Sequence, residues 1–118
     1  MRAVVLDPGH GGVGPRGYVT PGKRYVFVAP DGTKTPIYEG ERMRVLARFL
    51  AAELLDRSVR VFSSLDGRQI PPNLSGAQAD FPYPDVGLSS RVAFANSIRG
   101  SDGRRPLYLS LHSNAISS

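Results

Sequence analysis

Short apolar runs that alternate with helical patterns constrain the fold of this chain more than any other feature. Residues 2–7 and 106–111 are apolar runs of strand length, and residues 58–63 alternate between apolar and polar side chains, which also indicates a strand. Residues 41–57 and 89–99 carry apolar side chains at three- and four-residue steps, the period of an amphipathic helix. Strands that alternate with helices predict an α/β fold with a mainly parallel or mixed sheet flanked by helices. A chain of 118 residues is long enough for a single domain of this kind.

The same periods predict which face of each helix is buried. In the first helix the expected buried face consists of Met43, Leu46, Ala47, Phe49, Leu50 and Leu54. In the second helix it consists of Leu88, Val92, Ala95 and Ile98.

Two segments rich in turn-forming residues complete the expected organisation. Residues 25–28 and 35–38 flank a Pro-Asp-Gly turn, which predicts a hairpin. Pro36 has no backbone N–H and therefore places the second strand of this hairpin at a sheet edge. Residues 65–86 contain four prolines and predict a long connection. Connections of this length are usually functional or disordered.

Charge and composition narrow the classes of partner. Lys and Arg number 15 against 10 Asp and Glu, a net charge of +5, which favours anionic partners such as a membrane surface or phosphate-bearing wall polymers. The arginines are spread along the chain instead of forming a block, which argues against nucleic acid. No apolar run approaches the roughly 20 residues of a transmembrane segment. Residues 1–6 lack the plan of a signal peptide, so an export signal is either missing from this chain or not needed.

The chain has two histidines, and each follows an apolar strand. His10 lies three residues beyond the first run, and His112 directly follows the last. Parallel strands end at one edge of a sheet, where ligand sites gather, so the two imidazoles are candidates for a shared site. A hydrogen-bonded or surface histidine is the alternative at each position. The absence of cysteine excludes thiolate ligands, and a zinc site here would use His and carboxylate.

Glycines around His10 also fit a second motif. Residues 9–14 (GHGGVG) match the G-x-G-x-x-G fingerprint of dinucleotide-binding proteins. That fingerprint requires a helix that opens at the third glycine, with its N-terminus toward the pyrophosphate. Pro15, Gly17 and Pro21 follow instead, and no helical period appears before residue 41. We therefore interpret the match as fortuitous.

Several pieces of the sequence, in order, resemble one enzyme family. They are residues 4–12 (VVLDPGHGG), Glu39 before the helical segment VLARFLAAELLDR, residues 88–96 (LSSRVAFAN) and residues 109–115 (LSLHSNA). Together they resemble the zinc-dependent N-acetylmuramoyl-L-alanine amidases of the amidase type 3 family. The resemblance implies a phosphorylase/hydrolase-like fold and hydrolysis of the amide bond between N-acetylmuramic acid and L-alanine in peptidoglycan.

Carried over by position, the resemblance implies that His10, Glu39 and His112 bind one Zn²⁺ ion. Glu41 lies two residues from Glu39 and is the alternative carboxylate ligand. The implied partner is peptidoglycan, with anionic wall polymers as a further possibility. The implied setting is the periplasm, the cell wall or the secreted fraction, as for an autolysin, or phage-type lysis, as for an endolysin.

The sequence departs from the family at its C-terminal end. The family uses a further glutamate as general acid/base, beyond the second histidine, and no acidic residue follows His112 here. We expect that the chain lacks the C-terminal part of the domain. An acid/base at an unmatched position, or a catalytically inactive module that retains zinc and binds the cell wall, are the alternatives.

Three further residues have weaker expected roles. Arg91 is expected to be structural and not a substrate contact. Asn114 is expected to brace the loop beside His112 through backbone hydrogen bonds. Asp7 is expected to cap or orient the glycine-rich loop.

Overall fold

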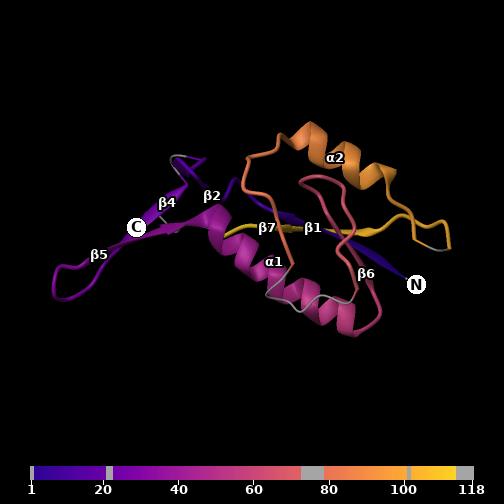
Figure 1. Cartoon of the computed structure of the whole chain (residues 1–118), viewed down its shortest axis with the longest axis horizontal. Coiled ribbons are helices and arrows are strands. Elements are labelled where there is room, and N and C mark those ends of the chain that lie inside the picture. The colour runs from indigo at the N-terminus through magenta and orange to yellow at the C-terminus, as the bar shows by residue number, and fades with distance from the viewer. Residues whose placement is uncertain (1, 21–22, 73–78, 101, 114–118) are drawn as a thin grey trace.

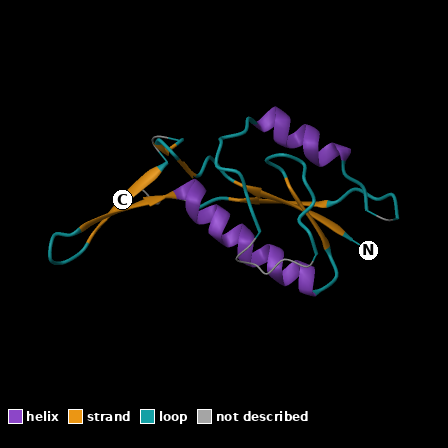
Figure 2. Ribbon diagram, viewed as in Figure 1, coloured by secondary structure: helices purple, strands orange, loops and turns teal. Residues whose placement is uncertain are grey.

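A three-stranded parallel sheet with a helix on each face forms the centre of the molecule (Figure 1). The structure is a computed structural model that describes residues 2–20, 23–72, 79–100 and 102–113. The strand order is β6-β1-β7, where β1 is Ala3–Pro8, β6 is Arg60–Ser63 and β7 is Leu107–Leu111. Helices α1 (Glu39–Asp56) and α2 (Leu88–Ser97) cover the sheet (Figure 2). The expected α/β class with a mainly parallel sheet is confirmed.

The central strand β1 divides the core into two layers. Successive side chains of a strand point to opposite faces of the sheet. Val4 and Leu6 accordingly lie in the cluster that contains Ala47 and Ala51 of α1. Ala3 and Val5 lie in the cluster on the other face, which contains Ile98 just beyond α2. Because β1 pairs in parallel with both neighbours, all three strands end at the same edge.

The buried face of α1 differs from the expected one. The helix begins at Glu39, and its buried residues are Gly40, Met43, Arg44, Ala47 and Ala51. Leu46 and Phe49, expected in the core, are 41% and 68% exposed. Small residues bring this helix close to the sheet, and the buried stripe is rotated toward Arg44. That rotation is possible because the Arg44 guanidinium is hydrogen-bonded inside the protein.

The prediction of the buried face of α2 is also wrong in part. Leu88 and Val92 are 73% and 44% exposed, and the buried residue of the helix is Arg91. Arg91 forms an ion pair with the buried Asp7 at the end of β1. This pair, with Ile98 after the helix, attaches α2 to the sheet.

Two antiparallel hairpins lie outside the sheet. Strands β4 (Arg24–Val28) and β5 (Lys34–Tyr38) form the predicted hairpin, which projects away from the sheet (Figure 1). Its β5 strand pairs only with β4 in the described residues, as expected from Pro36. Strands β2 (Val13–Gly14) and β3 (Gly17–Tyr18) occupy the place where a dinucleotide fingerprint would need a helix. The backbone therefore supports the interpretation that the match to the fingerprint is fortuitous.

The long connection over residues 65–86 contains no helix or strand in its described part, which excludes residues 73–78. It nevertheless contributes Leu65, Ile70, Ala79 and Phe81 to the core cluster under α1. Its described part is therefore a structural cover for the sheet. No helix among the described residues is long and apolar enough to cross a membrane.

Gly40 provides a test of how closely α1 approaches the loop after β1. A glycine-to-alanine change inside a helix normally stabilises it by roughly 1 kcal/mol. At Gly40 an added Cβ would overlap the carbonyl group of Gly11. We expect Gly40→Ala to destabilise the protein by about 1–3 kcal/mol, because the backbone must move apart. Urea unfolding measures this difference.

Gly87, which precedes α2, is the matched control because an added Cβ there meets no atom within 4 Å. Gly87→Ala is expected to change the free energy of unfolding by less than about 1 kcal/mol. A stabilised Gly40→Ala variant would contradict the close approach of helix and loop.

Candidate metal centre

Three elements that are distant in the sequence bring one side chain each to the carboxyl edge of the sheet. His10 follows β1, His112 follows β7, and Glu39 is the first residue of α1. One potential ligand atom from each of the three lies within 4.8 Å of the other two. In Figure 1 the beginning of α1 lies beside the end of β7. We refer to His10, Glu39 and His112 as the metal cluster.

Glu39 lies between the two histidines. Its Oε2 atom is 3.3 Å from Nε2 of His10, and its Oε1 atom is 3.6 Å from Nδ1 of His112. The imidazole rings approach edge to face, with centroids 5.3 Å apart. The backbone N–H of Ser113 donates a hydrogen bond to Oε1 of Glu39 at 3.0 Å. The carboxylate is thus oriented by the residue that follows His112.

Solvent reaches the metal cluster from the His112 side. The side chain of His112 is 47% exposed, whereas those of His10 and Glu39 are 23% and 14% exposed. The second candidate carboxylate, Glu41, accepts a hydrogen bond from the backbone N–H of Val13 and is not part of the cluster. Of the two glutamates, the structure brings Glu39 to the histidines.

Gly9 allows the two histidine loops to lie side by side. Its backbone N–H donates a hydrogen bond to the carbonyl oxygen of Leu111 at 2.9 Å. A Cβ at this position would be 2.5 Å from both Cε1 and Nδ1 of His112. Glycine is therefore required here by the space that the His112 ring occupies. The glycine in the sequence motif has a steric role at the site.

The donor set fits a zinc ion. Zinc in proteins is bound by His nitrogen and carboxylate oxygen at about 2.0–2.2 Å, and tetrahedral geometry then places ligand atoms about 3.4 Å apart. One ligand atom from each of the three residues lies within 4.8 Å of the other two, close enough for the three side chains to share one ion. In the described part of the chain the cluster has three members, which would leave a fourth position open. Sites with two histidines, one glutamate and an open position are typical of zinc hydrolases.

A buried ionic network lies beneath the metal cluster. Arg91 Nη1 donates to Asp7 Oδ1 at 2.7 Å, and both side chains are 6% exposed. The hydroxyl groups of Ser64 and Ser110 also donate to the Asp7 carboxylate, at 2.6 and 2.9 Å. Burial raises the pKa of Asp7, but these hydrogen bonds outweigh it and hold the pKa below its ordinary value of 3.8. Asp7 therefore remains ionised and joins β1, β7 and α2.

The structure describes two of the three residues with weaker expected roles. Arg91 is buried and donates to the carbonyl oxygens of Pro8 and His10, which fits the structural role predicted for it. Asp7 orients the glycine-rich loop through Arg91. Asn114 lies outside the described residues. Arg44, which is 2% exposed, was not predicted as a site residue, because periodicity places an arginine on the solvent side of a helix.

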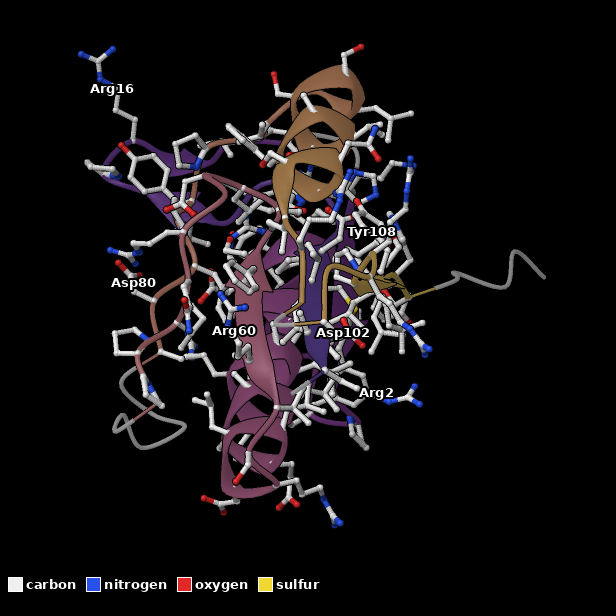
Figure 3. All side chains as sticks on the ribbon, turned by 90° about the vertical axis from the view of Figure 1, so that its right-hand side faces the viewer. Arg2, Arg16, Arg60, Asp80, Asp102 and Tyr108 are labelled. Atoms are coloured by element: carbon white, nitrogen blue, oxygen red, sulfur yellow. The ribbon has the colours of Figure 1, made fainter. Side chains whose placement is uncertain are left out.

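The arginines labelled in Figure 3 lie in different parts of the molecule. Arg2 and Arg16, both exposed, extend outward from well-separated parts of the molecule (Figure 3). Arg60, in contrast, lies over the ring of Phe62, with Cζ 5.1 Å from the ring centroid.

Comparisons with known proteins give no match: neither a protein-family model, nor a curated protein, nor a solved structure is similar to this chain.

Proposed function

We propose that this protein is a zinc-dependent amidase that hydrolyses the amide bond between N-acetylmuramic acid and L-alanine in peptidoglycan. The observation that carries the proposal is the convergence of His10, Glu39 and His112 at the carboxyl edge of a parallel sheet. The motifs that resemble the amidase type 3 family contain these same three residues in the same order. The proposal includes the phosphorylase/hydrolase-like fold of that family, which the parallel order β6-β1-β7 supports.

The chemistry of the site suits amide hydrolysis. Zinc bound there would supply Lewis acidity, which polarises a carbonyl group and makes hydroxide available near neutral pH. The low exposure of His10 and Glu39 leaves the half-exposed His112 side as the direction of substrate approach. Ser113 N–H holds the Glu39 carboxylate in place while substrate enters.

Proton transfer to the leaving amine requires a group besides the three residues of the metal cluster. No further His, Asp or Glu joins the cluster in the described part of the chain. This observation favours a second candidate function, a zinc-retaining module that binds the cell wall without hydrolysing it. Both candidates require about one zinc ion per chain, and they differ in turnover.

Digestion of purified peptidoglycan distinguishes the two functions. We expect the chain to release free stem peptides with N-terminal L-alanine, a chelator to stop the release, and added zinc to restore it. Mass spectrometry of the soluble products measures the release. Sedimentation with insoluble peptidoglycan, with and without chelator, measures binding separately.

The outcomes separate clearly. Zinc binding and sedimentation without release of peptides would contradict the amidase function and support the binding module. Failure to bind zinc at all would overturn both. The proposed site of action is the periplasm, the cell wall or the secreted fraction, or the wall of a host cell during phage-type lysis. The net charge of +5 supports contact with anionic wall polymers there.

A further inference from the structure

The carbonyl oxygen of His10 is held by two buried guanidinium groups. Arg44 Nη1 donates to it at 3.0 Å and Arg91 Nη2 donates to it at 3.1 Å. His10 has a φ angle of +60°, which is uncommon for a residue other than glycine. In this conformation its carbonyl faces the interior while its ring lies in the metal cluster. Hydrogen bonds to the carbonyl therefore hold the ring in position.

Arg44 also contacts the segment that carries Glu39. The same Nη1 atom donates to the carbonyl oxygen of Gly40 at 3.0 Å, one residue beyond Glu39. Its Nε atom donates to the carbonyl oxygen of Pro82 at 2.9 Å. One guanidinium group thus joins the loop of His10, the first turn of α1 and the long connection.

An arginine is unusual at a position as buried as that of Arg44. It forms no ion pair in the described part of the chain, and its Nη2 atom is buried without a hydrogen-bond partner. Burying a charge without a paired opposite charge is unfavourable. Two of its three carbonyl contacts are to the segments that bear His10 and Glu39, so its hydrogen bonds connect the two segments of the metal cluster.

We propose that Arg44 is a positioning residue that sets the spacing between His10 and Glu39 and thereby raises the affinity of the cluster for zinc. This inference rests on the proposed zinc site. It adds a residue that would affect zinc affinity without binding the ion itself. Residues that orient metal ligands typically contribute about 10–100-fold to metal affinity.

Arg44→Lys is the first test. Lysine keeps the positive charge but lacks the planar fork that bridges several carbonyl oxygens. We expect the zinc affinity of the full chain, measured by competition with a chromogenic chelator, to fall by about 10–100-fold. The absorption spectrum of the Co²⁺-substituted protein is expected to change, because it reports the geometry of the ligands. Arg42→Lys, on an exposed residue of the same helix, is the matched control and should leave both unchanged.

Gly12→Ala is the second test, for the case in which Arg44→Lys does not fold. A Cβ at Gly12 would be 2.9 Å from Cδ and 3.0 Å from Nε of Arg44, and 3.1 Å from Oε2 of Glu41, so the variant keeps Arg44 but forces its side chain to shift. Glu41→Ala is the control for the contact with Glu41. Circular dichroism of the zinc-free proteins confirms folding before affinity is compared.

Three results are decisive. Lower zinc affinity and an altered Co²⁺ spectrum in folded Arg44→Lys or Gly12→Ala would support the inference. Affinity and spectrum equal to those of the unmodified chain would overturn it while leaving the proposed function intact. An unmodified chain that binds no zinc would overturn the proposed function, and this inference with it.

Discussion

Glu39→Ala is expected to lower zinc affinity by more than about 100-fold. Residues that only orient ligands already contribute about 10–100-fold to metal affinity, and a direct ligand contributes more. Among the described residues Glu39 supplies the one carboxylate of the cluster, and its two oxygen atoms lie 3.3 Å from His10 and 3.6 Å from His112. Isothermal titration calorimetry or chelator competition measures the change. Peptide release from peptidoglycan should be lost in the same variant.

Glu41→Ala is a closely matched control for this experiment. Both glutamates lie in the first turn of α1, where a negative charge interacts favourably with the helix dipole, so both changes carry a similar cost to the helix. Glu41 contacts the backbone of Val13 and not the histidines. Its removal should leave zinc affinity unchanged. Equal losses in the two variants would contradict the assignment of Glu39 as the ligand.

Asp7→Asn is expected to destabilise the metal-free protein by about 3–5 kcal/mol. Breaking one side of a buried ion pair leaves the partner charge without compensation, and Arg91 is 6% exposed. Domains of this size are stable by roughly 5–15 kcal/mol, so the loss is a large fraction of the total. The midpoint of urea unfolding measures it. The surface pair of Asp102 and Arg104 is the control, and Asp102→Asn should cost less than about 1 kcal/mol.

The pH dependence of stability tests the same network. Burial raises the pKa of Asp7, but hydrogen bonds from Ser64 and Arg91 outweigh burial. The pKa of Asp7 in the folded state is therefore lower than its ordinary value of 3.8. A lowered pKa means that the unfolded chain takes up the proton first. The stabilisation by Asp7 is therefore complete well above pH 3.8 and is lost as the pH falls below that value. Asp7→Asn should show a shallower loss between about pH 5 and pH 2 than the unmodified protein. Identical slopes would contradict the role of Asp7.

Elements with strong local patterns were predictable. Strands β1 and β7 appear where apolar runs predicted them, and β6 appears where an alternating segment predicted it. Both helices begin within two residues of their expected starts. Apolar content and period depend on neighbouring residues alone, which is why they can be read from a sequence. The convergence of His10 and His112 followed from the rule that parallel strands end at one edge.

The buried faces of the helices were less predictable. A pattern of apolar residues assigns Arg44 and Arg91 to solvent, yet both are among the most buried residues. Arg91 depends on distant acceptors, the Asp7 carboxylate and the carbonyl oxygens of Pro8 and His10. Arg44 likewise depends on the carbonyl oxygens of His10 and Pro82. No local pattern contains those partners.

The sequence by itself therefore determined the α/β class, the order of elements and the two histidines at the strand ends, because each depends on local composition. Only the tertiary structure decided between Glu39 and Glu41. Two residues along a helix differ in direction by about 200°, so only one of them can face the histidines. The tertiary structure alone also decided that two arginines are buried, since the acceptors of their guanidinium hydrogen bonds come from parts of the chain that only folding brings together.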